Sequence, residues 1–344
     1  MKIRLFISMV CLCAATLTRG EDRTLNLFIW SEYIDPTVVT DFENEFQCKV
    51  VIDLYEDAEG MMSKLQGGGA SLYDVVVPPD YIVPGMRKLG LLRPIKLNKI
   101  PNFENIEPRF KGPPFDPRNQ FTVPYQWGTV GIFARTNALR SAEASWGVFF
   151  DPAKNGKTFV LIDSMRDLIG AALKYKGFKL NSTDPAELKT VRDMIVPAKN
   201  RAFAMESSVG GKNRVLGKSA QFAIVYSGEG ARGMTEDPAT VYLIPKEGSQ
   251  IWLDSLAILA NAPHPELAEK FLNYVLDGKV GARISNFTQF STPNKASKPL
   301  INKELLNNPA MYPPAEVLAR CEFLQDLGPK SRIYDELWTQ IKSR

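Results

Sequence analysis

Acidic side chains recur at the ends of several segments of this 344-residue chain, most of them beside aromatic residues. The clusters are Trp30 with Glu32 and Tyr33, Asp80 with Tyr81, Asp163 with Asp167, Tyr226 with Glu229, and Trp252 with Asp254. Carboxylates accept charge-assisted hydrogen bonds from ammonium groups, and aromatic rings attract cations by about 0.5 to 2 kcal/mol per contact. A single pair is explained equally well by a helix cap or by packing at the rim of the core. Their recurrence predicts a cleft that binds an organic cation with an apolar chain.

The first cluster lies where a predicted strand ends and a predicted helix begins. Residues 25–30 form a short apolar run, which is typical of a buried strand. Asp35-Pro36 is typical of a helix start, because Asp caps free N–H groups and Pro at the first helical position loses no hydrogen bond. Since the ligands of open α/β sheets bind at the carboxyl ends of strands, we expect residues 30–33 at a binding site.

Alternating strands and helices predict two α/β units, with a mostly parallel sheet and helices on both faces. In the first unit, the segments expected after the opening helix are Lys49–Tyr55, Ala58–Gln66 and Tyr73–Val77. In the second, they are the strands Thr158–Ile162, Gln221–Tyr226, Val241–Ile244 and Ile251–Ala260, and the helices Asp163–Lys176, Pro265–Leu276 and Tyr334–Ile341. Between the units we expect a loop at Phe103–Asn119. Phe121–Ala134 is expected as two strand pieces joined through Trp127-Gly128, where the chain crosses between domains.

Residues 1–20 predict an export signal. They combine a cationic start, an apolar run too short to span a membrane as a mature helix, and Thr18-Arg19-Gly20 at the usual cleavage spacing. Cys11 and Cys13 leave open a second route, processing at a lipid-carrying cysteine, although the residues before them are bulky for that position. The segment holds three of the charges behind the formal net charge of +4. The mature chain is therefore nearly neutral, and we expect no nucleic-acid partner.

Few residues suit a metal site or a catalytic nucleophile. Outside the signal, the chain has Cys48 and Cys321, whose pairing the sequence leaves open, and a single histidine, His264, which is expected to cap a helix. We expect no structural zinc site and no Ser-His-Asp or Cys-His-Asn system. The stretch Gly211–Ser219 (GKNRVLGKS) departs from the phosphate-loop pattern by one residue and follows no apolar strand. We interpret it as a basic surface loop and expect no cofactor.

Five stretches together resemble the spermidine/putrescine-binding proteins of bacterial ABC importers, over a span from about Leu25 to the C-terminus. They are FIWSEYID, YDVVVPPDYIV, VPYQWGTVGI, IWLDSLAI and STPNKAS. The resemblance implies an α/β fold of the two-lobed periplasmic-binding-protein type (type II, Venus-flytrap), in which discontinuous domains close around a ligand. It implies that residues 21–128 and 254–297 form one lobe, and residues 129–253 and 298–344 the other.

The resemblance also implies ligand-binding roles for individual residues. The positions that match the family's ligand contacts are Trp30, Ser31, Glu32, Tyr33, Tyr81, Asp167, Trp252 and Asp254. The positions that depart from it are Tyr226 (a tryptophan in the spermidine binders), Ser164 (an aspartate), Phe290 (a tyrosine) and Leu324 (near a glutamine). With Ser164 in place of the family's aspartate, the middle ammonium of spermidine lacks an acidic partner. Asp167 and Asp254 remain to bind two terminal ammonium groups. We therefore expect a diamine such as putrescine to bind at least as well as spermidine.

These features predict an exported, periplasmic, monomeric binding protein that captures a polyamine and delivers it to an ABC permease and its ATPase, with no bond made or broken. Two other hypotheses remain. The first is the same scaffold with another ligand, such as a basic amino acid, a quaternary amine or ferric ion, although the aromatic blocks around Trp30 and Trp252 favour an organic cation. The second is an exported enzyme with Asp/Glu acid–base chemistry in the cleft, which would turn its substrate over.

Overall fold

The computed structural model describes residues 23–139, 144–154 and 157–343, so the predicted export signal at residues 1–20 lies outside the described residues. The strands are β1 (Thr24–Trp30), β2 (Lys49–Tyr55), β3 (Val75–Val76), β4 (Thr122–Arg135), β5 (Phe159–Ile162), β6 (Ala204–Glu206), β7 (Phe222–Tyr226), β8 (Thr240–Leu243), β9 (Gln250–Ile258) and β10 (Glu322–Phe323). The α-helices are α1 (Pro36–Phe46), α2 (Ala58–Gln66), α3 (Val83–Lys88), α4 (Gly147–Phe150), α5 (Met165–Tyr175), α6 (Pro185–Arg201), α7 (Ser208–Leu216), α8 (Ser227–Glu236), α9 (Pro265–Val275), α10 (Gly278–Thr288), α11 (Lys303–Leu306), α12 (Ala315–Leu318) and α13 (Ser331–Ser343). Short 3-10 helices are η1 (Gly69–Ser71), η2 (Leu97–Lys99), η3 (Pro101–Asn105), η4 (Pro108–Phe110), η6 (Lys298–Leu300) and η7 (Gly328–Lys330).

The strands pair in the order β2-β1-β3-β9-β4-β7-β5-β6, with β10 also paired to β9 and β8 to β4. The outer pairs β1–β2, β1–β3, β5–β6 and β5–β7 are parallel. The central strands β4 and β9 run antiparallel to each other, and β3–β9, β4–β7 and β4–β8 are antiparallel as well. The sheet is therefore mixed. The prediction of a mostly parallel sheet holds for the outer strands and for the pair β9–β10, and is wrong for the antiparallel pairs that β4 makes and for β3–β9.

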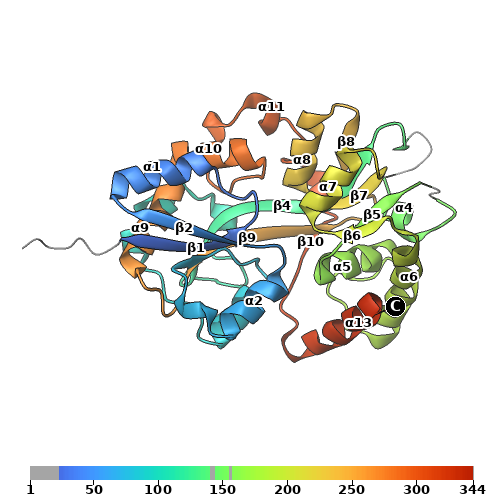
Figure 1. Cartoon of the computed structure of the whole chain (residues 1–344), viewed down its shortest axis with the longest axis horizontal. Coiled ribbons are helices and arrows are strands. Elements are labelled where there is room, and N and C mark those ends of the chain that lie inside the picture. The colour runs from blue at the N-terminus through green and yellow to red at the C-terminus, as the bar shows by residue number, and fades with distance from the viewer. Residues whose placement is uncertain (1–22, 140–143, 155–156, 344) are drawn as a thin grey trace, which may run out of the picture.

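The elements gather in two halves joined by the long central strands (Figure 1). The left half of the view holds β1, β2, α1, α2, α9 and α10, and the right half holds β5 to β8, α4 to α8 and the C-terminal helix α13. Helices lie on both faces of the strands in each half (Figure 1), and β1, β5 and β7 are mostly buried, whereas β2, at the edge of the sheet, is largely exposed.

The strand β4 is continuous, so the predicted division of Phe121–Ala134 into two pieces is wrong. Residues 122–129 pair with β9, whereas residues 130–135 pair with β7 and β8. At the change of partner, Gly128 lacks a side chain because a Cβ there would lie 2.6 Å from the Trp252 ring and 2.5 Å from the Ser227 hydroxyl. The absence of a Cβ lets the chain pass between the two parts of the sheet without a break.

Short sequence patterns correctly predicted where α1 and α9 begin. Asp35 caps α1 by accepting a 2.8 Å hydrogen bond from the Thr37 amide, as predicted. His264 does occupy the N-cap position of α9, but its side chain makes no capping bond; its ring lies 3.4 Å from Asp74 instead. Cys48 and Cys321 are both free thiols.

Two segments expected to be loops contain helices. The interpretation of Gly211–Ser219 as a surface loop is wrong, because most of it belongs to α7. The Ser207 hydroxyl accepts a hydrogen bond from Gly210 at the start of α7, and Gly211 lets the helix approach β7 closely, since a Cβ would lie 3.2 Å from Ala223. The predicted loop Phe103–Asn119 overlaps the 3-10 helices η3 and η4, each with Pro at its start.

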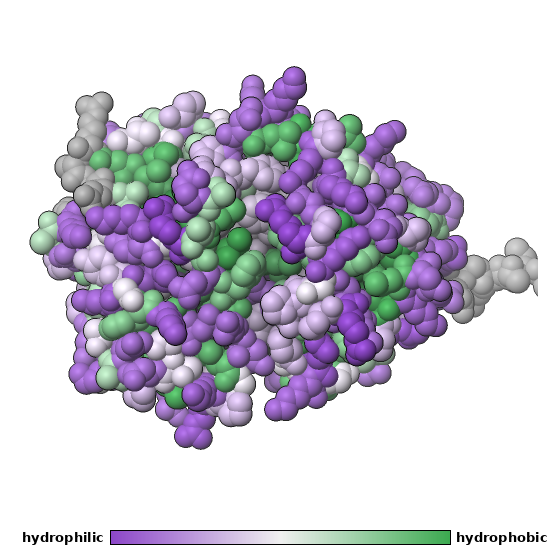
Figure 2. All heavy atoms as spheres, turned by 180° about the vertical axis from the view of Figure 1, so that it is seen from behind, coloured by the Kyte–Doolittle hydropathy of each residue, from purple (hydrophilic) through white to green (hydrophobic). Residues whose placement is uncertain are grey.

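The main hydrophobic core runs through both halves, and α-helical residues pack on each face of the sheet. Its largest fully buried side chains include Trp146, Phe42, Phe149 and Phe271. Seen from behind (Figure 2), the surface is mostly polar, with apolar side chains in several patches, one of them near the middle of the face. Within the described ranges, none of the helices combines the length and the apolar stretch that crossing a membrane requires.

Candidate functional site

One pocket lies where the carboxyl ends of the parallel strands of both halves converge. The strand ends at β1, β2, β5, β6 and β7 all contribute to its wall. This is the place at which ligands of open α/β sheets bind. Every residue predicted as a ligand contact, with the exception of Glu32, lines this pocket: Trp30, Ser31, Tyr33, Tyr81, Ser164, Asp167, Tyr226, Trp252, Asp254 and Phe290.

Several helices point their N-termini at the pocket. The first residues of α2, α5 and α7 line it, together with the junction of β7 and α8. Asp167 lies in the first turn of α5, and Glu229 lies in the first turn of α8. The partial positive charge of a helix N-terminus stabilises a carboxylate in the first turn, which offsets part of the cost of burying these acids.

Asp254 projects into the pocket from β9 and is 7% exposed. Its Oδ2 accepts a 2.9 Å hydrogen bond from the Tyr33 hydroxyl. Burial raises the pKa of Asp254 well above its usual value, and the charges of Asp80 and Asp167 raise it further, while the bond from Tyr33 acts in the opposite direction. The carboxylate is therefore buried next to other acids, with a neutral phenol as its hydrogen-bond donor.

Asp167 is 5% exposed and accepts a 2.7 Å hydrogen bond from the Tyr226 hydroxyl. Burial raises its pKa, against the hydrogen bonds from Tyr226, Ser164 and Gln250 and the charge of Arg166. Among the residues that the structure describes, neither Asp167 nor Asp254 has an ion-pair partner. A cationic group entering the pocket would find both carboxylates without a salt bridge to replace.

Aromatic rings form the walls between these acids. The Phe290 ring meets both Tyr33 and Trp252 edge to face, with ring centroids 5.2 Å apart in each pair. Tyr226 and Trp252 make a third edge-to-face pair at 6.0 Å. Trp30 is held by a 3.1 Å hydrogen bond from its Nε1 to the Val77 carbonyl. Rings fixed in this way present apolar faces and edges suited to a methylene chain.

Some pocket residues were missed from the sequence. Gln250 lines the pocket beside the predicted Trp252, and the Gln250 Oε1 and Trp252 Nε1 atoms are buried without a partner within the described chain. Alternation along the strand could have found Gln250, because it stands two positions before Trp252 and so faces the same side. Nothing comparable marks Ser207 and Ser208, which reach the pocket from the start of α7.

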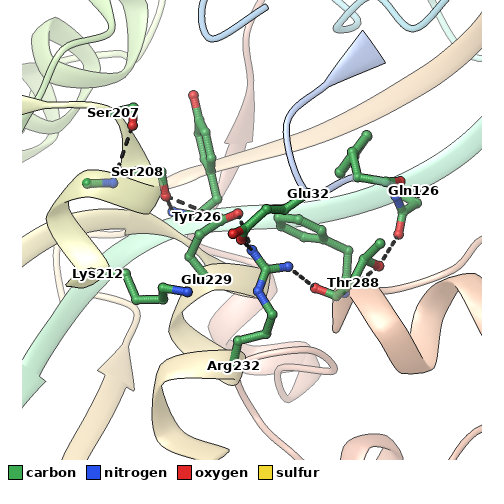
Figure 3. Close-up of polar contacts among 12 residues, drawn as sticks. Glu32, Gln126, Ser207, Ser208, Lys212, Tyr226, Glu229, Arg232 and Thr288 are labelled. Atoms are coloured by element: carbon green, nitrogen blue, oxygen red, sulfur yellow. Dashed lines mark hydrogen bonds and ion pairs between the residues drawn. The ribbon is translucent and has the colours of Figure 1, made fainter. Parts of the chain in front are cut away.

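Glu32 turns away from the pocket and toward α8. Its backbone has a φ of 52°, in the left-handed region, where a residue other than glycine is uncommon. Its carboxylate lies 2.7 Å from an Nη atom of Arg232, and Figure 3 shows the two side chains meeting beside Glu229. Leu324, the other position compared with the family, lines a separate groove.

The described residues include no group of His, Cys, Asp and Glu side chains arranged to hold a metal ion. The pocket combines buried acids, aromatic walls and unpartnered amide and indole groups. This combination can bind an ammonium group at each acid and an alkyl chain between the rings.

Comparison with known proteins gives consistent matches. A model of the family described as bacterial extracellular solute-binding protein matches residues 37–313. The chain is 31% identical over 325 residues to the spermidine/putrescine-binding periplasmic protein of Salmonella typhimurium, covering 94% of this chain and 93% of that one. It is 32% identical to the putrescine/cadaverine-binding protein of Pseudomonas aeruginosa over the full length of both chains.

A solved structure described as a putative spermidine/putrescine ABC transporter from Listeria monocytogenes superposes with a TM-score of 0.88 at 32% identity, over 93% of this chain and 99% of that one. The predicted two-lobed α/β fold is thereby confirmed. The resemblance to the spermidine/putrescine-binding proteins, predicted from five short stretches, is confirmed over nearly the whole chain.

Proposed function

Because this chain belongs to the bacterial extracellular solute-binding protein family, we propose that it captures a polyamine, putrescine or spermidine, and delivers it to an ABC permease and its ATPase. The observation that carries the proposal is that two buried carboxylates, Asp167 and Asp254, face one aromatic-walled pocket and are held by phenols rather than by cations. The relatives named for binding spermidine, putrescine or cadaverine support the same ligand class.

Binding proceeds by closure of two lobes around the amine. In this proposal, residues 21–128 and 254–297 form one lobe, and residues 129–253 and 298–344 the other. The change of partner along β4, from β9 to β7 and β8, supports a crossing point near residues 128–130. Asp254, bonded to Tyr33, and Asp167, bonded to Tyr226, belong to different lobes in this division, so both carboxylates bind the amine together when the lobes close. The amine thus shifts the population toward the closed form.

The proposal favours a diamine. Each of the two acids without an ion pair binds one terminal ammonium, and the rings of Trp252, Phe290 and Tyr33 flank the carbon chain between them. Ser164 offers a hydroxyl at a position where a third acid would serve a middle ammonium. Putrescine therefore binds at least as tightly as spermidine.

The ligand leaves the pocket chemically unaltered, and the protein acts as a monomer outside the cytoplasm. Export follows from the signal at residues 1–20, with attachment through a lipid on Cys11 or Cys13 as the alternative to a freely diffusing chain. Mass spectrometry of the mature protein distinguishes the two, because lipid attachment adds a mass that cleavage near Gly20 does not.

Calorimetry of the purified protein tests the ligand. Titration with putrescine and spermidine should show saturable one-to-one binding, whereas a basic amino acid and a quaternary amine serve as matched cationic controls. Tighter binding of either control than of both polyamines would reject the proposal, and spermidine binding tenfold tighter than putrescine would reject the diamine preference. Recovery of the amine by mass spectrometry after prolonged incubation tests for turnover, since an altered product would indicate an enzyme.

A further inference from the structure

A third acid, Glu229, shares the pocket wall with Asp167 and Asp254 but differs from them in its partners. It is 4% exposed, and each of its two carboxylate oxygens is engaged. Oε2 accepts a 3.1 Å hydrogen bond from Ser208, and Oε1 lies 3.0 Å from an Nη atom of Arg232, one turn further along α8. Of these three buried pocket acids, Glu229 is the one whose charge a basic side chain neutralises directly.

Arg232 is fixed from three directions. The same Nη atom that binds Glu229 lies 2.7 Å from Glu32, and the other Nη donates a 2.6 Å hydrogen bond to the Thr288 carbonyl at the end of α10. Figure 3 shows the guanidinium between these groups, with Lys212 nearby. Its Cζ also lies 6.0 Å from the centre of the Phe290 ring, which forms part of the pocket wall. The side chain is 13% exposed, so it is held immediately behind the pocket.

The partners of Arg232 come from both halves of the molecule. Arg232 and Glu229 lie on α8 in one half, whereas Glu32 follows β1 and Thr288 ends α10 in the other (Figure 1). Thr288 is itself tied to the Tyr33 segment, because its hydroxyl donates to Gln126 Oε1 at 2.6 Å and Gln126 Nε2 donates to the Tyr33 carbonyl at 3.2 Å. When the two halves are closed on each other, groups of the other half therefore keep the guanidinium against Glu229.

We propose that Arg232 is a specificity-determining residue: by neutralising Glu229 it leaves two of the three buried acids of the pocket, Asp167 and Asp254, free to bind ammonium groups, and so selects doubly charged over triply charged amines. The inference rests on the proposed polyamine function and adds to it the group that sets the charge count. Without Arg232, Glu229 presents a third buried carboxylate, which only an additional ammonium of the ligand can satisfy. Lys212 does not replace Arg232, because its amino group is 3.4 Å from Glu236 and makes no hydrogen bond to Glu229 among the described contacts.

The test compares the ratio of putrescine to spermidine affinity in matched variants by calorimetry. Arg232→Gln removes the positive charge that neutralises Glu229, and it also removes the ion pair with Glu32. Glu32→Gln removes only the latter contact and is the control for lobe closure. We expect Glu32→Gln to weaken both amines by the same factor, and Arg232→Gln to shift the ratio toward spermidine by about tenfold, as one added charge-assisted bond implies.

Two further variants keep the inference falsifiable if Arg232→Gln folds poorly. The double variant Glu229→Gln/Arg232→Gln should return the ratio to within about threefold of the wild-type value, because the acid and its partner are removed together. Glu229→Gln alone leaves the guanidinium paired with Glu32 and removes its negative partner in the pocket wall, so it should shift the ratio the other way, toward putrescine. Equal ratios in all variants that bind amines would overturn the inference, as would a shift in Glu32→Gln as large as that in Arg232→Gln. A wild-type protein that binds neither amine contradicts the proposed function instead.

Discussion

The two faces of strand β9 border two cavities of different character. Gln250, Trp252 and Asp254 face the pocket, whereas the alternate residues Ile251 and Leu253 face a groove of about 730 Å³, larger than the pocket itself. Successive side chains of a strand point to opposite sides, so one short segment supplies both cavities. Size alone would assign the ligand to the groove.

The charged groups of the groove are already satisfied. Glu322 pairs with Lys174 at 2.6 Å, and Arg109 pairs with Glu107 at 2.9 Å. Asp80, which also borders the groove, accepts hydrogen bonds from the backbone amides of Tyr81 and Leu253, and burial raises its pKa to about 7. The remaining lining is largely aromatic and aliphatic.

The faces differ in how their buried acids are bonded: Asp167 and Asp254 accept hydrogen bonds from phenol hydroxyls, whereas Asp80 accepts them from two backbone amides. This difference marks the candidate binding site better than volume does. Burying a carboxylate without a cation costs free energy. The fold accepts this cost twice on the pocket side, at Asp167 and Asp254, and once beside the groove, at Asp80, where two backbone amides offset it. The faces can be separated experimentally, since changes on the pocket side should alter affinity and changes on the groove side should alter stability.

Asp254→Asn should have the largest effect on binding. Asn keeps an oxygen for the Tyr33 hydroxyl at the same position, so the fold should be retained, but the charge that meets an ammonium is lost. A charge-assisted hydrogen bond contributes roughly 1.5 to 3 kcal/mol, so we expect putrescine affinity to fall by about 10- to 150-fold in calorimetry. Unchanged affinity in a folded variant would remove Asp254 from the site.

Asp167→Asn should have a smaller effect in the same direction. Arg166 lies close enough to lower the pKa of Asp167, so this carboxylate is partly compensated, whereas no cation acts on Asp254 in the same way. We expect putrescine affinity to fall by about 5- to 30-fold, a loss near the lower end for a charge-assisted bond. A larger loss than in Asp254→Asn, measured in the same titration series, would contradict the ranking.

The polar pocket side of β9 could be predicted from sequence because its signal is local. The Trp252 and Asp254 pair, the strand ending at Trp30 and the Asp35-Pro36 helix start are all short patterns. The neutralisation of Glu229 could not be predicted in this way. The spacing of Glu229 and Arg232 on α8 is local, but the position of the guanidinium also depends on a contact with Glu32, two hundred positions away, and on a left-handed backbone at Glu32 that no local residue type requires.

For the fold, too, features set by local sequence patterns could be predicted, and features set by contacts between distant segments could not. Alternating strands and helices predicted the α/β class, but the continuity of β4 depends on two different sets of partner strands that the sequence does not identify. The α7 segment looked like a loop because its glycines weaken helix propensity. Close packing of Gly211 on Ala223 of β7 overrides that propensity.

The pH dependence of putrescine affinity should report on the two pocket acids, Asp167 and Asp254. Burial raises the pKa of both Asp167 and Asp254, so unliganded protein retains protons that an ammonium must displace. Putrescine affinity should therefore rise with pH, by at most about tenfold per pH unit for each proton released, while the amine stays charged. The sign for stability is opposite: this contribution is fully present below the unfolded pKa and is lost as pH rises through the raised pKa values. Calorimetry in buffers of different ionisation enthalpy should show proton release, and the release should decrease in Asp254→Asn.

Leu253→Ala, on the groove side of β9, should have the smallest effect on binding. Leu253 is 3% exposed and lies between Trp252 and Asp254 in sequence, yet its side chain points away from the pocket. Truncating a buried leucine costs about 2 to 5 kcal/mol, and we expect the low end because the side chain borders an open groove. Urea unfolding should therefore show a loss of about 2 kcal/mol, with putrescine affinity within about twofold of wild type. A tenfold loss of affinity at unchanged stability would mean that the two faces of β9 are coupled, and that the groove takes part in binding.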